Sequence, residues 1–339
     1  GSEMCIRDSL RDMYAVMQIV IRDGKLLEGI RKEQAITVEG LIEKRDEETY
    51  NPKIPTGTIE LDAKEVTVLG EVYSQLPFEV MTSKSVVHED VRLKYRYLDL
   101  RNQKVKDNII FRSKVISYLR EKMTSMGFLE LQTPILCASS PEGARDYIVP
   151  SRKFKGKFYA LPQAPQQYKQ LLMVSGFDKY FQIAPCFRDE DARADRSPGE
   201  FYQLDFEMSF ATQEDVFAVG EEVLSSVFEK FAPEGSVVTK APYPIISYKQ
   251  AMLEFGSDKP DLRNPLRIID VTNFFQKCTF KPFIGKTVRA IRVHADMSKG
   301  FHEKLLKFAT GLGMGGLGYL EVLEDGSYKG PIAVSYTHL

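Results

Sequence analysis

The sequence predicts an α+β fold, and three observations lead to that prediction. Residues 180–188 and 201–210 alternate between apolar and polar side chains with period two, which is typical of half-buried strands. Residues 107–127 and 163–176 carry apolar residues at helical spacing between capping residues. Residues 10–75 read as short strands and turns, and a chain of 339 residues is long enough for two or three domains.

The composition is that of an ordinary globular protein. Lysine and arginine (46) balance aspartate and glutamate (47), so no global basic field indicates a nucleic-acid partner, and an RNA ligand would have to use local patches. The four cysteines are far apart and form no C-x-x-C pair, which argues against a disulfide framework or a zinc site and favours a reducing, cytoplasmic compartment. No apolar run approaches the ~18–20 residues of a membrane span, so we expect no membrane partner.

Three β-rich runs occupy the N-terminal region, at 13–21, 35–42 and 58–69. A turn that contains two prolines and a glycine, at 51–57, separates the last two runs. Such a set of short strands could belong to any small barrel, and composition alone does not choose among them.

Residues 76–107 read as a linker with a basic second half. Four cations interleave there with two tyrosines: Arg92, Lys94, Arg96 and Arg101 with Tyr95 and Tyr97. This run suits contact with an RNA backbone. It equally suits a basic amphipathic helix that packs on a neighbouring domain, so both interpretations stay open.

A helix followed by a strand opens the next region. Asp107 is suited to the N-cap of the helix, Gly127 to its termination, and the strand ends at Pro134. Any helix and strand would show this periodicity, so the proline and its context carry the interpretation. Residues 139–146 then form a turn-rich loop.

Residues 163–176 are a clearly marked helix. Pro165 suits the first helical position, and Gly176 suits the position beyond the C-terminus. Gln166 and Lys169 lie three residues apart and share one helix face. Taken alone, such a pair indicates no more than a solvated surface.

The strands at 180–188 and 201–210 form an antiparallel hairpin with one unusually polar face. On the second strand, the polar positions are Gln203, Asp205, Glu207 and Ser209. The connecting loop begins at Arg188 and carries charges of both signs. A solvated loop is the ordinary interpretation, but a mixed-charge loop beside a polar sheet face also suits binding of a polyanion together with a zwitterion.

These residues carry a family resemblance. Residues 187–190 (Phe-Arg-Asp-Glu) and the strand that follows resemble motif 2 of the class II aminoacyl-tRNA synthetases, and residues 186–196 are similar to the bacterial aspartyl enzymes in particular. The Pro-Gly pair before Glu200 departs from that pattern, and we interpret it as loop variation. The helix, strand and Pro134 match motif 1 of the same family, which builds a homodimer interface.

The resemblance implies an α+β architecture of several domains. Residues 10–75 are expected to be a partial OB-fold β-barrel that binds the anticodon and lacks its first two strands, and residues 76–107 the hinge. Residues 108–240 are expected to be an incomplete antiparallel-sheet catalytic domain, and residues 241–333 the inserted α/β domain of bacterial aspartyl enzymes. Two terminal segments show no periodicity, and we exclude them from the fold as tag or assembly residues: 1–9 and 334–339.

The resemblance further implies that L-aspartate and ATP form aspartyl-adenylate and that the aspartyl group then moves to tRNA. Arg188 is the expected catalytic residue, because its planar fork can bridge the substrate carboxylate and the α-phosphate. The expected aspartate-binding residues are Glu142, Gln166, Lys169, Arg188 and Asp205. The expected ATP-binding residues are Arg188, Asp189, Glu190, Phe201, on which adenine would stack, and Gln203.

One expected part of the family's site has no match. Gly311, Gly313 and Gly316 spell G-x-G-x-x-G, but no nucleotide-binding βαβ unit surrounds them. The same stretch begins like motif 3, yet Leu317 and Gly318 stand where Asp-Arg should be. We interpret both matches as chance. Motif 3 and the Mg²⁺ ligands near it are expected beyond residue 333, so the chain would be an inactive fragment that lacks motif 3.

Two alternatives remain at this point. The first is an asparaginyl-tRNA synthetase or an enzyme with relaxed Asp/Asn specificity. The second, from a different class, is a non-catalytic tRNA-binding or dimerisation paralogue. The loop at 139–146 and the inserted block favour the aspartyl enzyme over the first, and intact motifs 1 and 2 together with Lys169 argue against the second.

Overall fold

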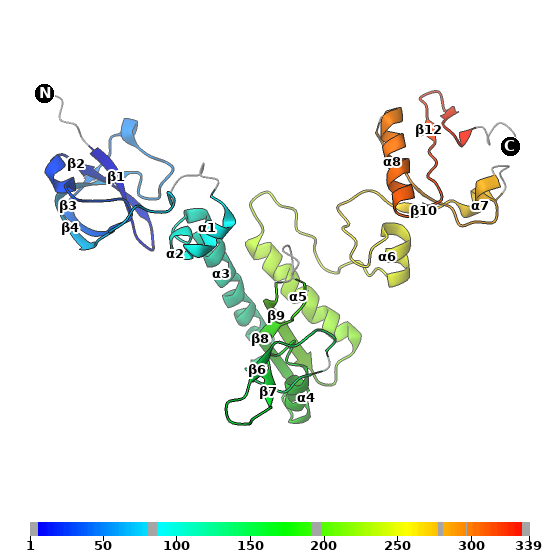
Figure 1. Cartoon of the computed structure of the whole chain (residues 1–339), viewed down its shortest axis with the longest axis horizontal. Coiled ribbons are helices and arrows are strands. Elements are labelled where there is room, and N and C mark those ends of the chain that lie inside the picture. Colours follow the sequence, from blue (N-terminus) through cyan, green and yellow to red (C-terminus); the bar gives the residue numbers. More distant parts are fainter. Residues whose placement is uncertain are drawn as a thin grey trace. The chain divides into compact units, whose positions relative to one another are not determined.

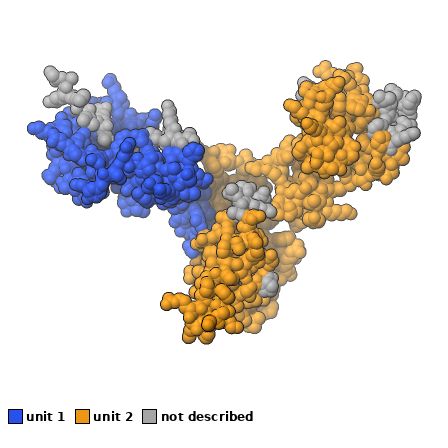
Figure 2. Space-filling view, viewed as in Figure 1, with its two compact units in different colours: residues 1–121 blue, residues 122–339 orange. Residues whose placement is uncertain are grey.

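The computed structural model describes residues 6–80, 87–140, 142–191, 198–276, 281–295 and 297–333. The chain divides into two compact units, residues 1–121 and residues 122–339, which Figure 2 distinguishes by colour. Figure 1 labels the helices and strands of both. The boundaries predicted at residues 75, 107 and 240 stay predictions.

The first unit contains a four-stranded sheet in the order β1-β2-β4-β3. Its strands are β1 (Ile6–Arg11), β2 (Val16–Ile21), β3 (Ala35–Lys44) and β4 (Ile59–Gly70), with short 3₁₀ turns at Gly24–Leu27 and Glu47–Thr49. The β2–β4 pair is parallel and the other two pairs are antiparallel. The three predicted strands are confirmed, and among the described residues the sheet does not close into a barrel.

The exclusion of the N-terminal segment is wrong for residues 6–9. These residues lie in β1 and pair antiparallel with β2, from Ile6 opposite Ile21 to Arg11 opposite Val16. The physical reason is tertiary, since β1 is a strand because β2 presents an unpaired edge to it, whereas its own sequence shows no alternation.

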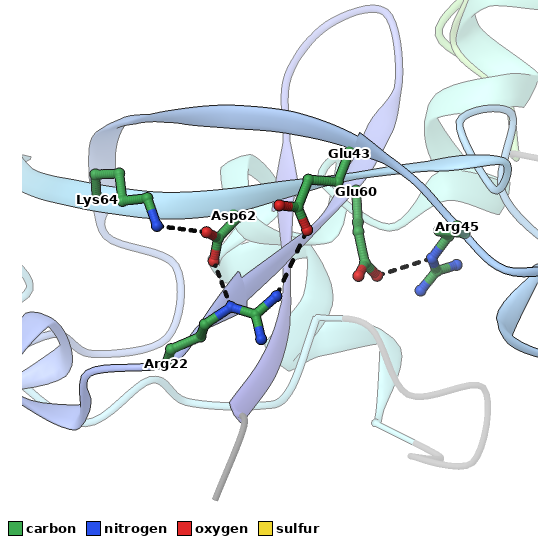
Figure 3. Close-up of polar contacts among 6 residues, drawn as sticks. All are labelled: Arg22, Glu43, Arg45, Glu60, Asp62 and Lys64. Carbon is green, nitrogen blue, oxygen red and sulfur yellow. Dashed lines mark hydrogen bonds and ion pairs between the residues drawn. The ribbon is translucent and has the colours of Figure 1, made fainter. Parts of the chain in front are cut away.

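The two faces of this sheet differ in chemistry. Ile19, Ile21 and Ala63 form a buried apolar core on one face. On the other face, Arg22 contacts both Asp62 and Glu43, Lys64 contacts Asp62, and Arg45 contacts Glu60, as Figure 3 shows. The Arg45 side chain is only 2% exposed, and it also donates to the carbonyl oxygen of Gly57.

The second half of the predicted linker is helical, whereas residues 76–80 are irregular. It contains α1 (Glu89–Lys94) and α2 (Arg96–Asp99), and α3 (Gln103–Ser125) follows. The buried Asp99 carboxylate accepts hydrogen bonds from Arg92 and Arg96, and Arg101 pairs with Glu33 at 2.8 Å. Three of the four predicted cations are therefore held by carboxylates of the first unit, and none of these contacts tests packing on the domain that follows, so both interpretations stay open.

The N-cap predicted at Asp107 is wrong. The helix already begins at Gln103, and the Asn102 side chain accepts the Lys104 N–H at 3.1 Å, so Asn102 serves the first turn. Asp107 lies inside that turn, where its carboxylate accepts a hydrogen bond from the Gln103 side chain.

The second unit is built on a three-stranded sheet in the order β5-β8-β9. Its strands are β5 (Leu129–Glu130), β8 (Lys179–Phe187) and β9 (Glu200–Met208); β5 runs parallel to β8, and β8 is antiparallel to β9. Helix α4 (Gln166–Val174) packs on β8 and β9, and a separate hairpin joins β6 (Ile148–Pro150) to β7 (Phe158–Ala160). The predicted central hairpin is confirmed.

Helix ends in this unit follow local sequence. Helix α5 (Gln213–Phe231) follows its N-cap Thr212, whose side chain forms a capping box with Asp215, and its sequence is amphipathic. Gly176 follows the C-cap of α4 with a φ of 88°, as predicted, because glycine adopts this conformation without steric cost. Pro165 occupies the N-cap of α4, one position earlier than predicted.

The last ninety residues contain short elements only. These are α6 (Tyr248–Phe255), β10 (Ile268–Asp270), α7 (Thr272–Phe275), a 3₁₀ turn at Lys281–Phe283, β11 (Arg289–Ile291), α8 (Lys299–Gly311), β12 (Glu321–Val322) and β13 (Tyr328–Lys329). The two strand pairs, β10–β11 and β12–β13, are antiparallel. The helix–strand mixture agrees with the α/β content predicted for this region.

Candidate active site

The polar face of the central hairpin is set by its strand register. Gln182 lies opposite Asp205, Ala184 opposite Gln203, and Cys186 opposite Phe201. Because side chains alternate along a strand, these positions share one face of the sheet. Period-two alternation predicted this face correctly.

Lys169 joins this face from helix α4. Its Nζ lies 2.8 Å from Asp205 Oδ1 and 2.9 Å from Glu207 Oε1. Lys169 and Asp205 side chains are each 10% exposed, and Glu207 is 35% exposed. Burial alone would lower the pKa of the lysine, but hydrogen bonds to the two carboxylates outweigh it and raise that pKa above its ordinary value. Lys169 is therefore a fixed cation.

The lysine leaves unused hydrogen-bonding capacity around it. An ammonium group has three donors, and two of them point at Asp205 and Glu207, so one remains for a ligand. Asp205 Oδ2 is buried and accepts no hydrogen bond with ordinary geometry from the described residues. A buried carboxylate oxygen without a donor is costly, and it suits a ligand that brings a cation.

Arg188 stands at the end of β8, where the hairpin opens. Its backbone N–H donates to the Gly199 carbonyl oxygen at 2.8 Å, and its guanidinium carbon lies 4.9 Å from the centre of the Phe201 ring. At that distance the cation is attracted to the ring face. Arg188 therefore covers one face of Phe201, the residue on which adenine is predicted to stack.

The Cys186 thiol is within electrostatic reach of several of the predicted charges. This thiol is buried, and burial raises its pKa to about 11. Asp205 and Glu142 raise this pKa further, while Arg188 and Lys169 lower it. Four of the predicted site residues therefore lie close enough to the same buried atom to influence its ionisation.

The remaining predicted residues make fewer contacts. Gln203 accepts a weak hydrogen bond from the Cys186 thiol at 3.4 Å, and Gln166 is half-buried in the first turn of α4. Glu142, Asp189 and Glu190 are exposed, and the Glu142 carboxylate accepts from the Ser140 hydroxyl instead of meeting Lys169 or Asp205. The charged loop residues Arg193, Asp195 and Arg196 lie outside the described residues.

Sequence reasoning missed several polar residues of the site. Gln182 is 4% exposed and accepts from the hydroxyls of Tyr180 (2.9 Å) and Thr133 (3.1 Å). Glu207 shares the face of Asp205, so its parity along β9 could have assigned it to the lysine. Gln163 is 2% exposed and bonds a segment nineteen residues earlier, which no local pattern indicates.

The described part of the chain lacks a metal-binding cluster and a membrane-spanning helix. It holds no group of three or more His, Cys, Asp or Glu side chains that could bind a metal ion. None of its helices combines the length and the apolar character that crossing a bilayer requires.

Comparison with known proteins gives consistent matches. Residues 88–303 match the family described as tRNA synthetases class II (D, K and N). The chain is 55% identical over 336 residues to the aspartate–tRNA(Asp/Asn) ligase of Ehrlichia chaffeensis and 52% identical over 330 residues to the aspartate–tRNA ligase of Streptomyces avermitilis. Each alignment covers 96% of this chain and 56% of the relative, so the chain spans little more than half the length of these proteins.

A solved structure shares the fold at low sequence identity. The asparaginyl-tRNA synthetase of Entamoeba histolytica, in complex with asparaginyl-adenylate, aligns with a TM-score of 0.62 and 19% identity, over 74% of this chain and 59% of that one. At 19% identity, the match supports a shared fold and does not assign a substrate to this chain.

Proposed function

The chain belongs to the class II tRNA synthetases of the D, K and N group, and from that membership we propose that it carries the aspartate- and ATP-binding part of an aspartate–tRNA ligase. The reaction joins the carboxylate of L-aspartate to the α-phosphate of ATP, which gives aspartyl-adenylate and releases pyrophosphate, and then transfers the aspartyl group to tRNA with release of AMP. One observation carries the proposal: a buried lysine is held by two carboxylates on a polar sheet face, next to an arginine that lies over an aromatic ring.

Lys169 is the residue that we propose binds the side chain of the substrate and distinguishes aspartate from asparagine. Its one available N–H donor would bind the β-carboxylate of aspartate, with help from Gln166. The amide of asparagine carries no charge, so its oxygen can accept this N–H only in a weaker hydrogen bond than the carboxylate of aspartate does. The preference for aspartate therefore follows from the charge of its side chain. The free Oδ2 of Asp205, with Glu142, would take the α-ammonium.

Arg188 is the proposed catalytic residue. Adenylate formation is an in-line attack of a carboxylate on the α-phosphorus, so the protein contributes positioning and charge neutralisation rather than covalent chemistry. A guanidinium can hold two oxyanions at once in a planar fork. Adenine stacking on Phe201 requires Arg188 to leave the ring, which frees its donors for the phosphate.

The nucleotide contacts complete the proposed site. Asp189, Glu190 and Gln203 would bind ATP from the end of the hairpin. In this family Mg²⁺ screens the phosphate charges, and the described residues offer no cluster for it. Leu317 and Gly318 replace the Asp-Arg of motif 3, so we propose that this chain alone does not form the adenylate; detectable ATP–pyrophosphate exchange would contradict this.

The domain roles belong to the same proposal. The β1–β4 sheet would be an OB-fold that binds the anticodon, residues 108–240 the catalytic domain, and residues 241–333 the inserted domain. Homodimerisation would use the motif 1 region, and the cytoplasm would be the compartment, as the cysteine pattern predicts.

A second candidate concerns the tRNA rather than the amino acid. The Ehrlichia chaffeensis relative is named for both tRNA(Asp) and tRNA(Asn). This favours an enzyme that places aspartate on either tRNA. Charging assays of the full-length protein with each purified tRNA decide between strict and relaxed use.

Isothermal titration with a non-hydrolysable aspartyl-adenylate mimic tests the site. We expect binding that is abolished in Lys169→Ala and in Arg188→Ala and unchanged in Lys155→Ala, an exposed lysine in the turn between β6 and β7. The asparaginyl mimic should bind far more weakly to the wild type. Equal binding of the two mimics, or an Arg188→Ala variant as tight as wild type, contradicts the assignment.

A further inference from the structure

Gln163, two residues before the N-cap of α4, makes an unusual set of contacts for a glutamine. Its side chain is among the largest fully buried ones in the described structure. Its Oε1 accepts the Ala144 N–H at 3.0 Å, its Nε2 donates to the Ala144 carbonyl oxygen at 2.8 Å, and the same Nε2 donates to Asp146 Oδ1. The amide thus pairs with both groups of one peptide segment, as a neighbouring strand would.

The segment that Gln163 holds is fixed at a second place. The Arg145 backbone carbonyl accepts the Asp189 N–H at 2.9 Å, and Arg145 Nε donates back to the Asp189 carbonyl oxygen at 2.9 Å. Leu161 N–H donates to the Tyr147 carbonyl oxygen at 2.9 Å. Residues 144–147 are therefore held between the start of α4 and the end of β8.

This placement ties three parts of the candidate site together. Glu142 stands two residues before the fixed segment, Lys169 follows Gln163 by less than two helical turns, and Asp189 follows Arg188 directly. Side chains whose backbone is held before a ligand arrives lose less conformational freedom on binding. Fixing the Ala144 peptide therefore favours one position for Glu142.

We infer that Gln163 is a positioning residue: its buried amide holds residues 144–146 so that Glu142 is presented to the substrate ammonium. This rests on the proposed function, because it assumes that the site binds an aspartyl ligand. Gln163 itself touches no predicted ligand position. Gln163 bonds Ala144 and Asp146, whereas Arg145 makes the bonds to Asp189. We therefore expect Gln163 to act on the affinity for the amino acid part of the ligand and not on the nucleotide part, which Arg188 and Phe201 would bind under the proposed function.

A double-mutant cycle with Glu142 tests the inference by titration. Gln163→Leu should weaken the aspartyl-adenylate mimic by about tenfold, the equivalent of about 1.4 kcal/mol, and leave binding of a non-hydrolysable ATP analogue within about twofold. If Gln163 acts through Glu142, adding Gln163→Leu to Glu142→Gln costs almost no further affinity. Gln170→Leu, at an exposed glutamine of α4, is the matched control and should bind as wild type does.

A second variant covers the case in which Gln163→Leu does not fold. Asp146→Ala removes one partner of Gln163 while the buried glutamine stays in place. We expect it to weaken the aspartyl mimic selectively and non-additively with Glu142→Gln. Equal weakening of both ligands, or full additivity with Glu142→Gln, overturns the inference and leaves Gln163 as a core residue.

The outcomes also separate this inference from the proposed function. If the wild type binds the mimic, and Lys169→Ala abolishes binding while Gln163→Leu does not change it, only the positioning role fails. If a folded wild type binds neither ligand, the proposed site itself fails.

Discussion

Replacing Lys169 with methionine keeps most of the apolar stem of the side chain and removes the ammonium group, with its charge and its hydrogen-bond donors. Two carboxylates then lose their counter-ion: Asp205, which is 10% exposed, and Glu207, which is 35% exposed. Removing one partner of a buried ion pair costs about 3–5 kcal/mol. Because Glu207 is open to solvent, we expect the lower end of that range, about 3 kcal/mol.

The assay must report on this sheet alone, because the chain has two units and unfolding as a whole need not be two-state. Hydrogen exchange followed by mass spectrometry meets this need, since it resolves peptides from β8 and β9. A loss of about 3 kcal/mol corresponds to exchange roughly 100-fold faster for the protected amides of these strands. The β1–β4 sheet should exchange as in the wild type.

Two further variants sharpen the result. Adding Asp205→Asn to Lys169→Met removes one of the stranded charges, so the double variant should exchange more slowly than the sum of the single effects predicts. Lys155→Met, at an exposed position, should match the wild type. If Lys169→Met changes the exchange of β9 by less than about threefold, the ion pair does not stabilise the sheet and our reasoning is refuted.

Three other predictions concern stability. Gly40→Ala should destabilise the first unit by about 1–3 kcal/mol, because the new Cβ would lie 2.1 Å from the Asp62 carbonyl oxygen. Gly220→Ala, with nothing within 4 Å, should stabilise α5 by about 0.5–1 kcal/mol. Hydrogen exchange of peptides from β3 and β4 and from α5 measures the two effects separately. The two arginines beside Asp99 lower its pKa, so the stability they provide is present above the unfolded pKa of about 3.9 and is lost as the pH falls through the folded value. Asp99→Asn should therefore remove part of the acid dependence of unfolding of the first unit, and an unchanged profile between wild type and variant contradicts this. Thr212→Ala removes the capping box and should lower the stability of the second unit by about 1 kcal/mol. We expect a lower melting temperature for this variant. An unchanged melting temperature would show that the cap does not stabilise α5.

The elements that sequence predicted well are those with a local cause. The hairpin of β8 and β9 follows from alternation that both strands carry, and α5 follows from its cap and its apolar spacing. β1 has no such signal, because its sequence is polar and its strand conformation depends on pairing with β2. The start of α3 was misplaced since Asn102 and Asp107 are both plausible caps, and only the fold shows which side chain reaches an N–H group.

The candidate site divides in the same way. Alternation along β9 placed Gln203, Asp205 and Glu207 on one face, and the family resemblance selected Lys169 as a site residue. That Lys169 pairs with both Asp205 and Glu207 depends on how α4 packs on the sheet, which no local pattern records. The sequence did not predict the contacts of Gln163 either, because its partner Ala144 lies nineteen residues away in a loop.

The Arg188–Phe201 contact has a consequence for the order of events at the site. The guanidinium covers one face of the ring, so each group shields part of the other from water. Under the proposed function, an adenine that stacks on this face displaces the arginine, which then needs new oxyanion partners. Stacking of the nucleotide base and binding of the phosphate by Arg188 are then coupled. A free adenine base, which brings no phosphate, would break the Arg188–Phe201 contact without giving Arg188 a new partner.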